Sequence, residues 1–391
     1  MTKIKYILSV IFIIIILKIS YSQNNECFDY SIEKCIKYKN NSIVFSSNMC
    51  VNKINSTERT TNIRVALFDS LFIKKWEVFL DSTQKSTLQD CEILNNSLVI
   101  ILNEEYNIID SIHKRKIFRG RFYKINLNDG EILNSKTIDK CIIASQIINN
   151  HIVVFGNEII RKEHSYDDLE NTDGVLMKYN DNLELLEKQP FLNNFSYGAF
   201  KFNSLFTFYD KNKMFLMSRR IKEYKMLSSK ICLNYKNREW VFAIEYFNYN
   251  DLQKKYISDS IVCLDCKYFN SSQLAVDMLN RKAYYGNYIV RNDPTTSYKY
   301  DLDLRTKKIN ETKILANKVY ILENGDFAVY EMKTRFIKIY SCNNKLKKTY
   351  NVNNINLNRK DFCFYETNKN LFIVYVFNNQ IFFEKIHIIH N

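Results

Sequence analysis

The stretches Asn40-Asn-Ser-Ile-Val44, Asn95-Asn-Ser-Leu-Val99 and Asn149-Asn-His-Ile-Val153 decide the fold that this sequence predicts. They recur at spacings of 55 and 54 residues, and each is a polar turn that leads into an apolar strand. Looser copies with the same turn chemistry follow at Lys211-Asn-Lys-Met-Phe215, Gly286-Asn-Tyr-Ile289, Asn324-Gly-Asp-Phe327 and Asn368-Lys-Asn-Leu371. Together they indicate a sevenfold internal repeat.

A second landmark comes after the first in most units. It is a hairpin of two alternating strands around a turn that contains Asn, Asp or Gly, residues that tolerate the positive φ of tight turns. The predicted hairpins are Arg64–Phe79, Arg121–Ile138, Val175–Lys188, Ile231–Tyr246 around Asn237, Ser297–Ile314 and Arg335–Val352. Two interleaved landmarks in one phase are much less probable by chance than either alone.

Composition agrees with an all-β chain. Tyr and Phe number 27 each and Pro only 2, so the local propensity favours strands. A unit of roughly 40–55 residues with four strands has the size of a propeller blade. We therefore expect a single β-propeller of four-stranded antiparallel blades over residues 23–391. Seven blades are favoured; six blades with an insertion near 251–283, including a short helix at Ser272–Leu279, are the alternative.

The two ends of the chain are expected to meet. The run Phe382–Ile388 should complete the last blade together with a strand near Ile43–Phe45. Cys35 and Cys363 lie eight residues before Ile43 and Leu371, at equivalent places in the first and last units. We expect them to form a disulfide across the closure, where a bond that closes a long loop stabilises most.

The N-terminus has the layout of a signal peptide. Lys3 and Lys5 precede an apolar run from Ile7 to Leu17 that is too short to span a bilayer. Small residues at Ser20 and Ser22 then fit cleavage before Gln23. Residues 1–22 are therefore predicted to direct export, to a secreted or periplasmic location, with no stable membrane insertion after cleavage. All ten cysteines follow this segment, and an oxidising compartment permits disulfides.

The formal net charge is +14, which raises the question of anionic partners. The positive residues are scattered, however, and the longest cluster is His113-Lys-Arg-Lys116. Nucleic-acid binding needs a stripe of such clusters with exposed aromatic residues, so we do not expect it.

Three motifs carry weak chemical signals. Cys263-Leu-Asp-Cys266 has the spacing of half a zinc site but lacks a second pair of ligands. His387 and His390 would lie on opposite faces of a strand. The loop Glu163–Gly174 is rich in oxygen ligands, but its spacing differs from that of an EF-hand. No catalytic residue, metal ligand or cofactor is assigned from these motifs.

At its hairpins the sequence resembles the repeats of secreted bacterial propellers of the quinoprotein-like (PQQ-type repeat) superfamily. Phe122-Tyr-Lys-Ile-Asn-Leu-Asn-Asp-Gly-Glu-Ile-Leu133 is similar to such a unit, and Trp76 stands where that hairpin places its tryptophan. Most units lack the Trp and the Gly. The resemblance therefore implies a fold and does not imply quinone chemistry.

The sequence thus favours a monomeric, non-enzymatic propeller that binds a protein or glycan partner through loops on one ring face. The alternative is a glycan-active hydrolase or lyase with carboxylates gathered at the axial mouth. A surface structural protein is a third hypothesis. Acidic or basic side chains from different blades that converge with shifted pKa values would favour the enzyme.

Overall fold

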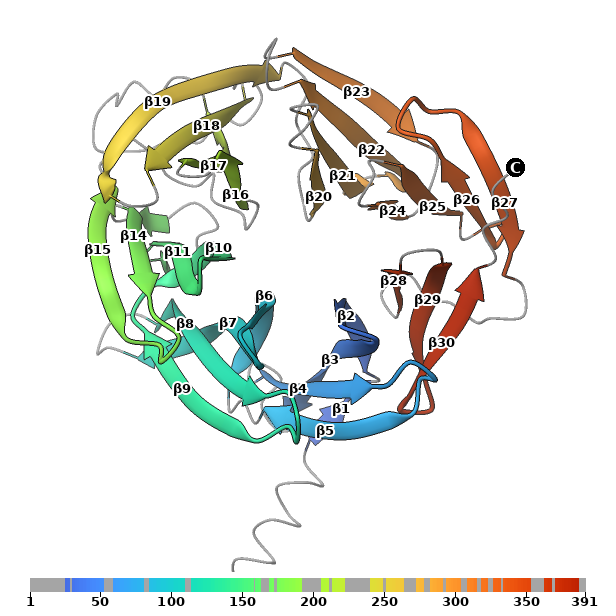
Figure 1. Cartoon of the computed structure of the whole chain (residues 1–391), viewed down its shortest axis with the longest axis horizontal. Coiled ribbons are helices and arrows are strands. Elements are labelled where there is room, and N and C mark those ends of the chain that lie inside the picture. The colour runs from blue at the N-terminus through green and yellow to red at the C-terminus, as the bar shows by residue number, and fades with distance from the viewer. Residues whose placement is uncertain are drawn as a thin grey trace, which may run out of the picture.

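The computed structural model describes most of the chain from Asn25 onward. The described ranges are 25–28, 30–52, 59–80, 84–109, 114–157, 159–162, 169–171, 174–191, 205–210, 213–221, 240–248, 251–263, 272–277, 282–290, 293–303, 308–314, 318–322, 326–331, 333–352, 362–367 and 370–386. The regular elements in these ranges are β-strands, arranged as a ring of sheets around a central axis (Figure 1). Within the same ranges, no helix is long and apolar enough to cross a membrane.

The first half of the ring consists of three sheets. The first contains β1 (Asn25–Cys27), β2 (Ser31–Tyr38), β3 (Asn41–Asn52), β4 (Arg59–Phe68) and β5 (Lys74–Leu80). The second contains β6 (Lys85–Leu94), β7 (Ser97–Ile109), β8 (Lys114–Asn126), β9 (Ile132–Ile138), β12 (Ile159–Lys162) and β13 (Leu169–Asn171). The third contains β10 (Cys141–Ile148), β11 (His151–Asn157), β14 (Gly174–Tyr179) and β15 (Leu185–Phe191).

The remaining sheets follow in chain order. The fourth contains β16 (Leu205–Asp210), β17 (Lys213–Ile221), β18 (Trp240–Asn248) and β19 (Asp251–Cys263). The fifth contains β20 (Ser272–Asp277), β21 (Lys282–Val290), β22 (Asp293–Asp303) and β23 (Lys308–Ile314). The sixth contains β24 (Lys318–Ile321), β25 (Phe327–Glu331), β26 (Phe336–Tyr340) and β27 (Leu346–Asn351). The last contains β28 (Phe362–Thr367), β29 (Asn370–Phe377) and β30 (Gln380–Ile386).

Each sheet is antiparallel. Figure 1 shows β2, β6, β10, β16, β20, β24 and β28 on the inside of the ring and β5, β9, β15, β19, β23, β27 and β30 on the outside. In the first sheet β3 pairs with β2 through its first part and with the short β1 through its last residues. The fold is therefore a β-propeller, as the sequence predicts.

The core lies between neighbouring sheets. Successive residues of a strand point to opposite faces, so a sheet packed on both sides needs apolar residues at both parities. On β3, Ile43 and Phe45 pack with Leu98 and Ile100 of the second sheet, while Val44 faces the last sheet. This explains why the repeat reads as a continuous apolar run after each turn.

The described strands form seven sheets, and the sequence repeat has seven units. That each sheet is one blade of the propeller stays a prediction. Two local expectations are wrong. Ser272–Asp277 form strand β20 instead of a helix, and Gly286–Ile289 lie inside β21 instead of at its turn. Of the hairpin expected at Ile231–Tyr246, residues 231–239 lie outside the described part of the chain, and Trp240–Asn248 form one strand that pairs with β17 and β19. The region near 251–283, which the six-blade alternative treats as an insertion, contains β19 and β20, which belong to regular four-stranded sheets.

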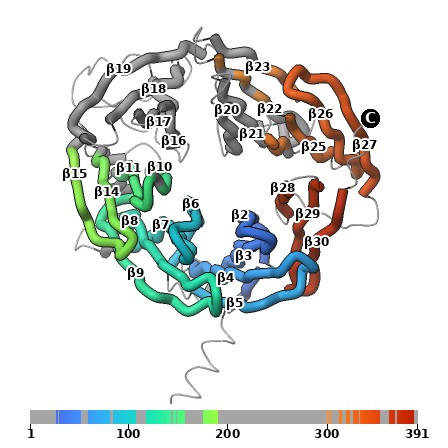
Figure 2. Tube along the Cα trace, in the orientation of Figure 1, coloured from blue at the N-terminus to red at the C-terminus, as the bar shows by residue number. Residues whose placement is uncertain are grey.

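The expected closure by a shared strand is also wrong for the described residues. β30 pairs with β29, and Ile43–Phe45 pair with β2 and β4 inside the first sheet. The first and last sheets instead meet through apolar side chains: Ile32, Val44, Ala66 and Phe68 against Cys363, Tyr365, Phe372 and Val374. In Figure 2 the first sheet, blue, and the last sheet, red, lie side by side at this seam.

Candidate functional site

The inner strands of the first three sheets share one irregularity. A bulge shifts the register between Ile32 and Lys34, between Leu88 and Asp90, and between Ile142 and Ala144. Each bulge changes the direction in which the side chains after it point. Just after them, Lys34 pairs with Phe45 and Asp90 pairs with Ile101, at matched places in the two sheets.

Polar side chains from these strands meet beyond the bulges. Lys34 Nζ donates hydrogen bonds to Asp90 Oδ1 at 2.6 Å and to the Cys91 carbonyl oxygen at 3.3 Å. Ser145 Oγ donates to Asp90 Oδ2 at 3.2 Å. Asp90 therefore links β2, β6 and β10. We call Lys34, Asp90, Glu92 and Ser145 the axial cluster.

Glu92 lies two residues beyond Asp90 on β6, on the same side of the strand. It accepts a hydrogen bond from the Ile147 backbone N–H at 2.9 Å. Burial, the negative charge of Asp90 and the hydrogen bond between the two carboxyl groups raise the pKa of Glu92 to about 7, against the opposing effects of Ile147 N–H and Lys34. Near neutral pH this carboxyl group is therefore divided between its charged and neutral forms.

The groups around Glu92 differ in protonation. Burial alone would lower the pKa of Lys34, but the neighbouring Cys91 and the Asp90 carboxylate, which also accepts its hydrogen bond, raise it overall. Burial raises the pKa of the Cys91 thiol to about 12, so Cys91 is no nucleophile near pH 7. Solvent still reaches the cluster, since the side chains of Lys34 and Asp90 are 39% and 22% exposed.

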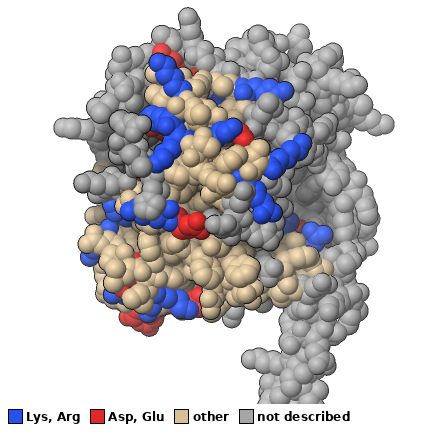
Figure 3. Space-filling model, turned by 90° about the vertical axis from the view of Figure 1, so that its right-hand side faces the viewer, with Lys and Arg blue, Asp and Glu red and all other residues tan. Residues whose placement is uncertain are grey.

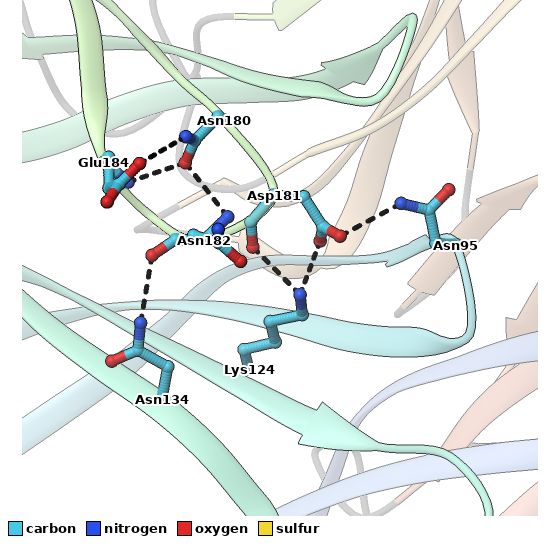
Figure 4. Close-up of polar contacts among 7 residues, drawn as sticks. All are labelled: Asn95, Lys124, Asn134, Asn180, Asp181, Asn182 and Glu184. Atoms are coloured by element: carbon cyan, nitrogen blue, oxygen red, sulfur yellow. Dashed lines mark hydrogen bonds and ion pairs between the residues drawn. The ribbon is translucent and has the colours of Figure 1, made fainter.

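The cluster lies toward one face of the ring. Glu92 is two residues from the end of β6, where the Asn95-Asn96 turn begins, a rise of only about 7 Å. The turn between the third and fourth strands of the third sheet lies at the same face, because Asn95 Nδ2 donates to Asp181 Oδ2 at 3.0 Å (Figure 4). We call this side of the ring the turn face.

Contacts between neighbouring sheets hold the turn face in place. Lys124 Nζ lies 2.7 Å from Asp181 Oδ1 and donates to the Asp181 carbonyl oxygen at 3.0 Å. Asn134 Nδ2 donates to the Asn182 carbonyl oxygen at 2.9 Å, as Figure 4 shows. Between the first two sheets, Trp76 Nε1 donates to the Leu127 carbonyl oxygen at 3.0 Å. The turns of the first three sheets are therefore joined into a fixed rim on the turn face.

The other candidates from the sequence are placed as follows. Cys363 Sγ lies 2.9 Å from Cys35 Sγ. A disulfide joins Cys27 and Cys50, a pairing that the sequence does not reveal. Cys263 ends β19, while Cys266, His387 and His390 lie outside the described residues. The loop Glu163–Gly174 falls around β13, whose side chains are not described.

Neither a metal site nor a positive stripe stands out. Within the part of the chain that the structure describes, no three His, Cys, Asp or Glu side chains gather as metal ligands. On the side of the ring seen in Figure 3, Lys and Arg are scattered among uncharged residues. Among the described residues, the axial cluster joins polar side chains of three sheets and includes groups with shifted pKa values.

Sequence reasoning missed the axial cluster. Its signal is the pair of acidic residues in Leu88-Gln-Asp-Cys-Glu-Ile-Leu94, an otherwise apolar strand before a turn. The partners Lys34 and Ser145 stand 56 and 55 residues from Asp90, one repeat away on either side. Only the register of the strands shows that these side chains meet.

No protein family model matches the chain, and no curated protein is significantly similar to it in sequence. Its fold is similar to that of several solved structures. A protein of unknown function from Bacteroides caccae is 10% identical, with 74% of this chain and 89% of that chain covered and a TM-score of 0.37. The propeller domain of the Trilobed protease from Pyrococcus furiosus, described as having an open velcro topology, is 9% identical over 92% and 94% of the two chains, with a TM-score of 0.44.

The acylaminoacyl peptidase of Pyrococcus horikoshii is 11% identical, with 78% of this chain and 46% of that chain covered and a TM-score of 0.41. Membership of the quinoprotein-like superfamily stays a prediction.

Proposed function

We propose that this chain binds a glycan at the centre of the turn face, without cleaving it. The observation that carries the proposal is the axial cluster, in which four polar side chains from three sheets alternate as donors and acceptors. Sugar hydroxyl groups both donate and accept hydrogen bonds, so they suit a site that offers an ammonium, a hydroxyl and carboxyl oxygens together.

The geometry favours binding over hydrolysis. Glycosidases place two carboxyl groups on either side of the scissile bond, whereas both carboxylate oxygens of Asp90 are already engaged by Lys34 and Ser145. The pKa of Glu92 does suit an acid or base near pH 7. A hydrolase or lyase is therefore the alternative, and it would need a second catalytic group in addition to Asp90 and Glu92.

Export to a secreted or periplasmic location is part of the same proposal. The Cys27–Cys50 disulfide is compatible with an oxidising compartment, and the segment 1–22 that would direct export lies outside the described residues. We further propose that the protein acts as a monomer, with the fixed rim of turns as its binding surface.

A glycan array probed with the purified protein tests the function. We expect binding to a restricted set of glycans, lost in Asp90→Asn and retained in Asp139→Asn, which changes an exposed carboxylate just after β9, at the end of that strand away from the turn face. Mass spectrometry of the glycans after incubation separates the two functions. Intact glycans support binding, and shortened or unsaturated products support the enzyme. Failure to retain any glycan contradicts both.

A further inference from the structure

Cys35 and Cys363 meet across the seam that closes the ring. Cys35 lies on β2 and Cys363 on β28, the inner strands of the first and last sheets, and their Sγ atoms are 2.9 Å apart. The two thiols are in hydrogen-bonding contact although 328 residues separate them in sequence.

The register explains why these two side chains meet. The inner hairpins turn between Tyr38 and Asn41 and between Thr367 and Asn370. Counted from these turns, the residue that matches Cys363 is Lys34, not Cys35. The equivalence of the two cysteines expected from the sequence is therefore wrong by one residue.

That offset of one residue is what produces the contact. A residue at the place of Lys34 points toward the following sheet, and the residue after it points toward the preceding sheet. The same relation brings Ser145 to Asp90 at the junction of the second and third sheets. Two short side chains at equivalent places would both point the same way around the ring, whereas the long side chain of Lys34 does reach Asp90 at such a place.

Non-covalent contacts join the seam in the described part of the chain. Arg64 Nη1 donates a hydrogen bond to the Asn379 carbonyl oxygen at 2.8 Å, and apolar side chains pack across it, while neither β2 nor β28 pairs with a strand of the other sheet. Apolar side chains pack in a similar way between the first and second sheets and between the sixth and last sheets, but there the chain itself also connects the two sheets. A covalent bond at this seam would supply the missing connection.

We propose that Cys35 and Cys363 form a second disulfide, which fastens the first blade to the last. Bond formation proceeds by exchange with an oxidised dithiol or glutathione disulfide. Cys35, which is partly exposed, attacks one sulfur of that disulfide and releases one thiol. Cys363, which is buried beside it, then attacks the mixed disulfide and releases the second thiol. Two thiols are oxidised to one disulfide, and the reagent disulfide is reduced to two thiols.

The bond would act mainly on the unfolded chain. A cross-link between residues so distant closes nearly the whole sequence into one loop and lowers the entropy of the unfolded state. The Cys27–Cys50 disulfide closes a short segment inside the first sheet and cannot have this effect. The proposed bond therefore stabilises the closed ring as a unit.

Peptide mapping of the full chain, incubated with oxidised glutathione and alkylated without reduction, tests the proposal. We expect one peptide pair that links Cys35 to Cys363 and separates on reduction. The loop also makes the denatured protein compact, so its band should migrate faster in a non-reducing gel. Cys363→Ser should abolish the shift, and Cys342→Ser, at a turn of the sixth sheet, should retain it.

The unmutated protein alone can overturn the proposal, so the outcome does not depend on whether the variants fold. Recovery of Cys35 and Cys363 both alkylated, or bonded to other cysteines, in protein whose Cys27–Cys50 bond has formed contradicts it. In the oxidised protein we also expect a thermal midpoint several degrees above that of the protein with this one bond reduced. Equal midpoints would show that the bond does not close the ring.

Discussion

Lys34 on β2 and Asp90 on β6 occupy matched places in two consecutive sheets, yet they carry opposite charges and their side chains meet at 2.6 Å. A repeated fold offers the same place in each unit, and here that place holds a cation in one unit and an anion in the next. The pair binds the first two sheets near the axis, and Asp90 extends the link to the third sheet through Ser145.

Replacing Lys34 by Met should destabilise the ring. The change leaves Asp90 without its ammonium partner, and because solvent still reaches both groups we expect a loss of about 1–2 kcal/mol in the free energy of unfolding. Lys74→Met is the matched control, since Lys74 pairs with Glu77 at 3.0 Å on the exposed outer strand. We expect the control to change by less than about 0.5 kcal/mol in urea unfolding. Equal losses in the two variants would show that the axial pair has no special strength.

The raised pKa of Glu92 predicts a stability change between about pH 4.5 and pH 7. In this window the folded protein binds more protons at Glu92 than the unfolded chain does, so stability falls as the pH rises through it. This stabilising contribution is complete below the pKa of Glu92 in the unfolded chain and absent above its pKa in the folded protein. We expect Glu92→Gln, which keeps the neutral form, to remove this decline.

The measurement is the free energy of unfolding of both proteins at pH 5 and pH 8. Other titrating groups are common to the two and cancel in the comparison. The variant should gain stability relative to the parent at pH 8. A variant that loses stability equally at both pH values would show that Glu92 is charged in the folded state at both.

The sequence reveals the strands and their turns more reliably than their register. When the first two units are aligned by residue type, Ile43 corresponds to Leu98. In the structure, however, the inner turn of the first sheet is Lys39-Asn40, whereas that of the second sheet is Asn95-Asn96. Lys39 and Asn95, the first residues of these turns, have φ values of 54° and 55°. Ile43 therefore matches Val99, and each faces the following sheet. A slip of one residue exchanges the two faces of a strand.

This limit explains which parts of the site could be predicted. The proximity of Cys35 and Cys363 follows from a ring whose first and last units are neighbours, so the sequence leads to it even with an incorrect register. The contact between Lys34 and Asp90 depends on the bulges of β2 and β6, which no residue pattern marks. No residue pattern shows that the ring closes without a shared strand either, because β30 has the same alternation of side chains with or without an additional partner strand.

Gly130 should tolerate no side chain. Its φ of 82° is a conformation that residues with a Cβ rarely adopt, and a Cβ there would lie 2.9 Å from Trp76 Cε3. We expect Gly130→Ala to lower the free energy of unfolding by about 1–3 kcal/mol. Asn128→Ala, two residues earlier in the same turn and exposed, is the control and should change it by less than about 0.5 kcal/mol. An unchanged thermal midpoint in Gly130→Ala would mean that the turn can move away from Trp76.

We expect the contact between Lys124 and Asp181 to keep the turn face rigid. Lys124 is largely buried, and Asp181 also accepts a hydrogen bond from Asn95, so Asp181→Ala removes two links between the second and third sheets (Figure 4). We expect a loss of about 1–2 kcal/mol in stability and faster hydrogen exchange at the 180–184 turn. Glu184→Ala is the control, because its side chain contacts only Asn180 of its own turn among the hydrogen bonds shown in Figure 4. We expect Asp181→Ala also to weaken ligand binding at the rim, and Glu184→Ala to leave binding unchanged. Equal hydrogen-exchange rates in the two variants would show that the turn is held by its own backbone.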